Sequence, residues 1–114
     1  MSERIYSKKL FQGYLPSSVA SQYAAPSQYF TRIRTMSVVN TDTSVRTFVL
    51  YLSGTTAAAQ ITANAVSLAA NGGKWLWSDG EMDLGPGDYI AGTGSVASKL
   101  VLTITGEEHG AMFQ

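Results

Sequence analysis

Hydrophobic residues along the chain occur in short runs, which Gly, Asn, Asp or Ser interrupt at intervals of about 8 to 12 positions. Few of these runs show the i, i+3, i+4 spacing of an amphipathic helix. The clearest strand is 99–105, where every second residue is a large aliphatic one. Successive side chains of a strand point to opposite faces, so we expect Leu100, Leu102 and Ile104 to face the core.

Two longer apolar segments, 30–39 and 46–53, also have strand character. The residues between them, Asn40-Thr41-Asp42-Thr43-Ser44, have side chains that cap tight turns, which predicts a hairpin. Further strands are expected at 61–68, 74–78 and 88–91.

Three turns separate these later strands. Asn71-Gly72 tolerates the positive φ angles of a tight hairpin turn, and Gly85-Pro86-Gly87-Asp88 fits a type II turn. We expect Gly92-Thr93-Gly94-Ser95 to turn the chain into its last strand. The alternative to this all-β pattern is a helix over 56–70, which is rich in Ala but lacks an apolar stripe.

Residues 1–27 differ in character, being rich in Ser, Tyr and Ala, with Pro16 and Pro26 interrupting regular ladders. They are either an extended arm or a pair of edge strands at 11–15 and 19–23. We therefore predict an all-β fold: a single β-sandwich or jelly-roll-like domain over 28–106, with an extended N-terminal arm over 1–27, unless that segment forms edge strands, and a short polar tail over 107–114.

Composition narrows the classes of function. The chain has 114 residues, of which 45% are hydrophobic and 14% charged, so one packed domain is expected. It has no cysteine, which excludes a disulfide framework and a thiolate metal site. The sequence shows neither a secretory signal nor a membrane span, and its zero net charge argues against nucleic acid as a partner. Residues 1–50 are nevertheless basic and residues 51–114 acidic.

The order of these signals resembles that of the small β-sandwich virion proteins of tailed bacteriophages, which serve as decoration, head-tail or tail components. The segments that carry the resemblance are Tyr29–Arg34, Val39–Asp42, Arg46–Leu50, Leu68–Trp75, Gly87–Ile90 and Leu100–Gly106. The chain departs from the pattern in having Asn71-Gly72-Gly73 where such proteins often have Pro-Gly.

The resemblance implies a non-enzymatic structural protein that is present in many copies. Its partners would be copies of itself and other virion proteins, such as the major capsid or tail proteins. It would be located in the virion after synthesis in the host bacterial cytoplasm.

Residue types that could carry chemistry do not form a recognised site. His109 is the only histidine, and the sequence has no Gly-x-Ser-x-Gly motif, so we expect no catalytic residue and no cofactor. Asp79, Glu81 and Asp83 are spaced to project to one side of a strand. A calcium loop would need Gly and Glu where the chain has Leu84 and Ile90, so we expect no metal site either.

The remaining expectations concern interfaces. Trp75 and Trp77 would point to the same side of a strand, where they either close the core, fill a protein partner's pocket or stack on a sugar. Arg32 and Arg34 share a strand face and could pair with the acidic cluster of another copy. The N-terminal segment would add apolar contacts, so the full set of interface candidates is Tyr14, Leu15, Tyr23, Arg32, Arg34, Trp75, Trp77, Asp79, Glu81 and Asp83.

An alternative function is a ligand-binding β-sandwich, such as a carbohydrate-recognition or receptor-binding module. It would use Trp75, Trp77 and the acidic cluster, with carbohydrate as its partner.

Overall fold

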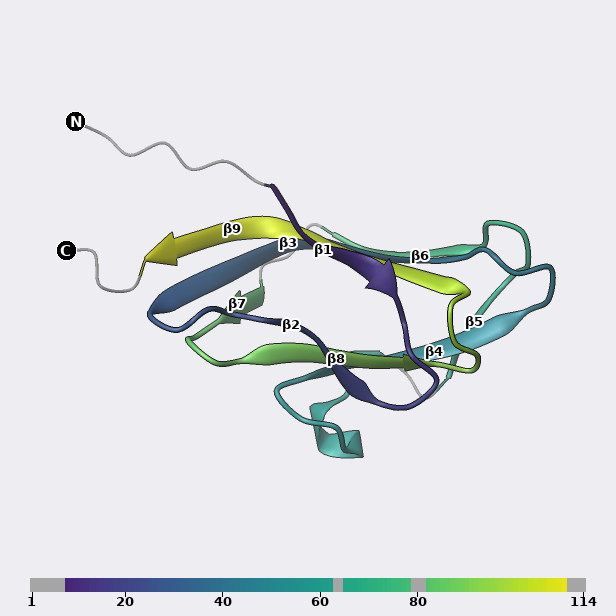
Figure 1. Cartoon of the computed structure of the whole chain (residues 1–114), viewed down its shortest axis with the longest axis horizontal. Coiled ribbons are helices and arrows are strands. Elements are labelled where there is room, and N and C mark those ends of the chain that lie inside the picture. Colours follow the sequence, from purple (N-terminus) through teal and green to yellow (C-terminus); the bar gives the residue numbers. More distant parts are fainter. Residues whose placement is uncertain (1–7, 63–64, 79–81, 111–114) are drawn as a thin grey trace.

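A computed structural model describes residues 8–62, 65–78 and 82–110, and it confirms the all-β prediction. Two antiparallel sheets pack face to face (Figure 1). Helical structure within the described residues is one short 3₁₀ turn, η1, at Ala57–Ala59. The strands are β1 (Lys8–Tyr14), β2 (Ala20–Ala24), β3 (Tyr29–Asn40), β4 (Arg46–Leu52), β5 (Val66–Leu68), β6 (Lys74–Trp77), β7 (Met82–Leu84), β8 (Tyr89–Gly94) and β9 (Leu100–Gly110).

The strand order is that of a jelly roll. The five-stranded sheet has the order β1-β9-β3-β6, with β7 also pairing with β3. The four-stranded sheet has the order β2-β8-β4-β5. β6 and β7 occupy the same side of β3, so each sheet has four positions, and all but two of the eight connections cross from one sheet to the other. This arrangement is a jelly-roll β-sandwich.

The crossings explain why the expected hairpins are absent. The segment 40–44 was expected to join two paired strands, but β3 and β4 belong to different sheets. The turn at Asn71-Gly72 has the expected positive φ angles, 58° and 105°, yet it also connects strands of different sheets. The local signals for these turns are correct, whereas the pairing of the strands is set by packing across the whole domain.

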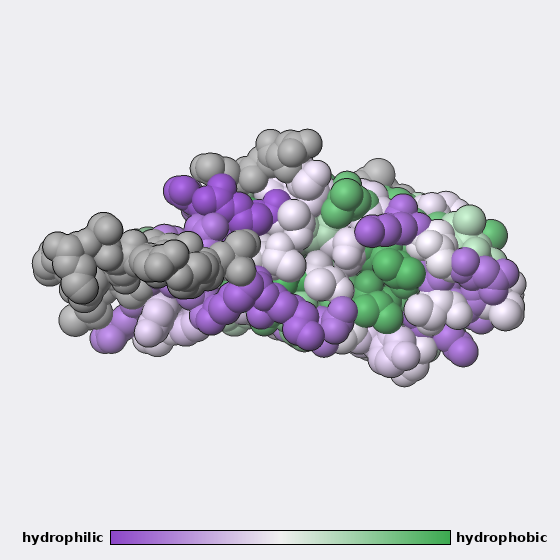
Figure 2. Space-filling model, turned by 90° about the horizontal axis from the view of Figure 1, so that it is seen from above, coloured by the Kyte–Doolittle hydropathy of each residue, from purple (hydrophilic) through white to green (hydrophobic). Residues whose placement is uncertain are grey.

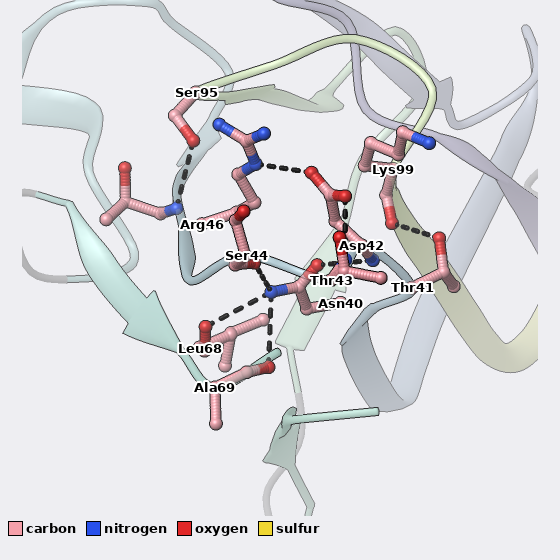
Figure 3. A network of polar contacts seen from close by, with 11 residues as sticks. Asn40, Thr41, Asp42, Thr43, Ser44, Arg46, Leu68, Ala69, Ser95 and Lys99 are labelled. Carbon is pink, nitrogen blue, oxygen red and sulfur yellow. Dashed lines mark hydrogen bonds and ion pairs between the residues drawn. The ribbon is translucent and has the colours of Figure 1, made fainter. Parts of the chain in front are cut away.

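A buried asparagine holds the corner where these two turns meet (Figure 3). Asn40 is fully buried, and its amide nitrogen donates to the backbone carbonyls of Ser44 (2.9 Å), Leu68 (3.2 Å) and Ala69 (3.1 Å). Its side-chain oxygen accepts from the backbone N–H of Asp42 at 2.9 Å. Asn40 therefore joins the end of β3 to the segments that precede β4 and follow β5.

The core lies between the sheets and is formed by the inward residues of alternating strands. The prediction for Leu100, Leu102 and Ile104 is confirmed, because all three are fully buried. Burial of each such side chain contributes on the order of 1.5–3 kcal/mol. The other buried apolar residues are Leu15, Tyr23, Ala25, Ile33, Met36, Val38, Phe48, Leu50, Leu68, Leu84, Ile90 and Ala91.

The alternation along β3 changes phase once. Thr31 and Ile33 face the core, but beyond them Met36 and Val38 do. The change occurs at Arg34, the position of β3 that the backbone register with β9 skips: Ile33 pairs with Gly106, and the next pair is Thr35 with Thr105. A single inserted residue of this kind is a β-bulge.

The alternative of edge strands for the N-terminal segment is the one that the structure shows. β1 pairs with β9 and β2 pairs with β8, each at the edge of its sheet. Leu15 and Tyr23 belong to the buried core, so the described residues 8–24 are part of the sandwich and the expected extended arm is wrong for them. The expected tail is corrected as well, because β9 continues to Gly110.

Several other elements and turns can be compared with their expected positions. Among the described residues of the expected strand 61–68, only β5 is a strand, and among those of the helix alternative over 56–70, only the 3₁₀ turn η1 is helical. Gly87 has φ of 85°, and the Asp88 N–H bonds to the Gly85 carbonyl at 3.0 Å, as a type II turn requires. Gly92 is not in a turn but inside β8, where an added Cβ would lie 2.8 Å from Leu50 and 2.9 Å from Leu15. Glycine is needed there for close packing.

Candidate functional site

The outer face of the five-stranded sheet carries two rows of uncharged side chains. Residues paired across antiparallel strands share a face, so the pairing defines the rows. One row runs across the sheet through Tyr14, Val101 and Val39, and ends at Lys74. The next row runs through Gln12, Thr103, Ser37 and Leu76.

We call the seven uncharged members of these rows the neutral face: Gln12, Tyr14, Ser37, Val39, Leu76, Val101 and Thr103. Figure 2 looks down onto this side of the molecule, where groups of green and white residues lie right of the centre, with purple residues around and between them. Tyr14 and Leu76 are each 56% exposed, so two large apolar side chains of this face are in contact with solvent.

Hydrogen bonds between neighbouring strands hold polar side chains on this side of the sheet. The amide nitrogen of Gln12 donates to the Thr103 hydroxyl at 3.1 Å, and the hydroxyls of Thr35 and Thr105 bond to each other. Ordered side chains lose less conformational entropy when a partner covers them. The neutral face is therefore suited to contact with another protein surface.

Charged side chains gather at the other end of the same sheet, in ion pairs within the molecule. The Arg32 Nε lies 3.0 Å from Asp83 Oδ1, and the Arg34 Nε lies 2.8 Å from Glu107 Oε2. Arg32 and Asp83 are direct neighbours on β3 and β7. The expectation that the arginines form a basic patch for an acidic patch on another copy is therefore corrected, because the two arginines already have acidic neighbours.

Glu107 is the most interconnected of these carboxylates. Its hydrogen bond from Arg34 lowers its pKa below the ordinary value of 4.5, with a smaller contribution from His109. The His109 Nε2 lies 3.6 Å from Glu107 Oε1. Glu107 is thus held in its charged form by two neighbours.

Tyr23 connects the two sheets through its hydroxyl. It bonds to the Thr31 hydroxyl at 2.9 Å and donates to Glu108 Oε2 at 2.6 Å. Burial, together with the hydrogen bond to Glu108, raises the pKa of Tyr23 to about 12. Leu15 and Tyr23 are both buried, so they cannot supply the exposed interface contacts expected of them, whereas Tyr14 remains exposed.

The two tryptophans point to the same side, as predicted, and that side is the core. Trp75 pairs with Val38 and Trp77 with Met36, both of which are buried. Trp75 also packs edge-on against Phe48, with ring centroids 5.5 Å apart. Of the alternatives for these residues, closing the core is the one that the structure shows.

The acidic cluster falls partly outside the described residues, because Asp79 and Glu81 lie there. Within the described part of the chain, His, Asp and Glu side chains do not gather in a group that could hold a metal ion. None of the helical segments described has the length and apolar character needed to cross a membrane.

Sequence reasoning missed most of the neutral face. The alternation in 99–105 marks Val101 and Thr103 as outward, and Leu76 lies outward between two inward tryptophans. These signals place each residue on a face, but only the strand order shows that β1, β9, β3 and β6 bring them together.

Comparisons with known proteins add a structural likeness. No protein-family model matches the chain, and no curated protein matches it. A solved chain of Bacillus endospore appendages, described as a family of disulfide-linked pili, aligns with 96% of this chain and 91% of its own length, at 17% identity and a TM-score of 0.47. The present chain has no cysteine with which to form such disulfides. Membership of the tailed-phage virion proteins stays a hypothesis.

Proposed function

We propose that this protein is a non-catalytic structural protein that assembles in many copies. We further propose that its setting is the virion of a tailed phage, where it would contact copies of itself and other virion proteins after synthesis in the bacterial cytoplasm. The neutral face is the observation that carries the proposal.

The physical argument rests on the cost of desolvation. A protein interface has a core that is depleted of charge and a polar rim. The neutral face has this composition: Tyr14 and Leu76 supply exposed apolar surface, and Lys74 stands at its border. Covering it would bury apolar area without leaving a charged group unpaired.

The phage setting is supported by two associations. The sequence resembles small virion proteins over residues 28–106, and jelly rolls are frequent in viral capsid proteins. Because one fold hosts many functions, the setting requires a direct test.

Sedimentation velocity over a wide range of concentration tests the assembly. The wild-type chain should sediment as a species heavier than the 12.2 kDa monomer, and Leu76→Lys should shift it toward the monomer. Val45→Lys is the matched control, because Val45 is 60% exposed in the corner between β3 and β4 and lies off the neutral face. A wild-type monomer at all concentrations would contradict self-assembly, and equal effects of both lysines would contradict the role of the neutral face.

A further inference from the structure

A groove of about 470 Å³ lies at one end of the five-stranded sheet. The neutral face lies toward the other end of the same sheet. The lining of the groove combines an aromatic side chain with charged and polar groups: Phe30, Thr31, Arg32, Asp83, Gly85 and His109. Pockets for small molecules have volumes of roughly 300–1,000 Å³ and such a mixture of apolar surface with a few polar groups.

The groove follows from the register of three strands. Phe30 on β3 lies opposite His109 on β9, and Arg32 lies opposite Asp83 on β7. Gly85 follows directly after β7, beside Phe30, and has no side chain to fill the space there. The result is a hollow with the Phe30 ring on one side and the Arg32–Asp83 pair on another.

The aromatic ring is available for stacking. Phe30 is 51% exposed, although it lies on the longest strand pair of the domain. The face of an aromatic ring carries partial negative charge, which attracts the slightly positive C–H groups on one face of a pyranose ring.

The polar groups can bind hydroxyls. The Asp83 side chain is 61% exposed while it pairs with Arg32, so a ligand hydroxyl can reach its carboxylate. A planar carboxylate and a guanidinium side by side accept from and donate to neighbouring hydroxyls of a sugar. His109, whose side chain is 37% exposed, adds a third polar group at the opposite wall.

We infer that this groove is a binding site for a pyranose sugar, which stacks on Phe30 and hydrogen-bonds to Asp83 and Arg32. The site goes beyond the assembly role and occupies a different part of the surface. It also differs from the sugar site considered in the sequence, whose tryptophans face the core.

Saturation-transfer NMR tests the site, with the methyl glycosides of glucose, galactose, mannose and N-acetylglucosamine as probes. At least one should bind with a Kd on the order of 1 mM, as expected for a monosaccharide in an open groove. Phe30→Ala should weaken that binding by about tenfold or more, which reflects the loss of the stacking surface.

Gly85→Leu is the decisive variant because it fills the hollow and leaves the polar groups in place. A Cβ at position 85 would meet only ordinary contacts, 3.5 Å from Asp88 and 4.0 Å from Phe30, and Gly85 does not have a positive φ. The variant should keep its amide spectrum outside the groove and lose sugar binding.

Val45→Ala, which removes an exposed apolar side chain away from the groove, should bind as the wild type does. Absence of saturation transfer to all four glycosides would overturn the inference. Unchanged binding in both Gly85→Leu and Phe30→Ala would overturn it as well. Neither result would bear on sedimentation of the wild-type chain, so the assembly proposal is tested separately.

Discussion

The Tyr23 hydroxyl lies 2.6 Å from Oε2 of Glu108, so one hydrogen bond joins the edge strand of the four-stranded sheet to a central strand of the other sheet. The same hydroxyl bonds to Thr31, and Glu108 is also paired with Lys8 at 3.3 Å. Four strands, β1, β2, β3 and β9, therefore meet at this polar link.

The Tyr23 link predicts a loss of stability at high pH. Because the folded state raises the pKa of Tyr23 from 10.0 to about 12, its contribution to stability is complete below pH 10 and is lost as the pH rises toward 12. Urea unfolding of the wild type should show this loss over that window, and Tyr23→Phe should show a smaller one. Tyr23→Phe should also be about 1.5–3 kcal/mol less stable at neutral pH, as for hydrogen bonds to charged groups. If the stability of the wild type and of Tyr23→Phe depended on pH in the same way, the predicted role of the Tyr23 hydroxyl would be contradicted.

The ion pair between Arg34 and Glu107 predicts a loss of stability at acidic pH. The Arg34 guanidinium lowers the pKa of Glu107 below 4.5, so the stabilisation is present above that pH and is lost as the pH falls through the lower folded value. Melting temperatures measured from pH 7 downward should therefore fall less steeply below pH 4.5 for Glu107→Gln than for the wild type. Arg34→Gln should flatten the profile in the same way, and an unaltered slope in both variants would show that the pair is not responsible.

Asn40 is expected to be among the most sensitive polar positions. Replacement by Ala would remove the donor that now bonds to the carbonyls of Ser44, Leu68 and Ala69, of which Ala69 would keep only the Gly73 N–H, at a cost of roughly 2–4 kcal/mol. Asn40→Asp should be at least as damaging, because it places a carboxylate against those carbonyl oxygens. Thr41→Ala is the control, since it removes one exposed hydrogen bond to the Lys99 carbonyl and should cost about 1 kcal/mol or less. Urea midpoints that rank the Ala variants in the reverse order would contradict this role for Asn40.

Removal of the N-terminal strands should unfold the domain. A chain that begins at Ser27 would lack β1 and β2 and, with them, the buried Leu15 and Tyr23. Loss of a large buried side chain alone costs about 2–5 kcal/mol, which is comparable with the whole stability of a small domain. Circular dichroism should show loss of β structure in the shortened chain and its retention in full-length Tyr14→Ala. A folded shortened chain would mean that these strands are dispensable.

The sequence was sufficient for the fold class because alternation and turn residues are local signals. Leu100, Leu102 and Ile104 were placed in the core from their spacing, and the positive φ at Gly87 from its turn. Strand pairing was not accessible, because the contacts that place β4 in the other sheet from β3 join residues distant in the chain. The segment 8–24 illustrates the same limit: its strands are stabilised by β9 and β8, about 70 to 100 residues away.

The sites were less predictable than the fold. Arg32 and Asp83 were each identified as interface residues, but their mutual contact depends on the register between β3 and β7. The groove beside Phe30 depends on a missing side chain at Gly85, and a glycine after a strand was indistinguishable from a turn residue.

The extra residue at Arg34 has a consequence for how the strands find one another. β3 and β9 form the longest ladder in the domain, and a regular ladder of this length could slide by two residues while keeping its apolar face inward. Such a shift would, however, move Gly106 away from the bulge. A Cβ at position 106 would clash with the backbone of Arg32 and Ile33, and a shift by two residues would place Ile104 or Glu108 there instead. The bulge at Arg34 and the glycine at position 106 together favour the observed register over shifted pairings of β3 and β9 during folding.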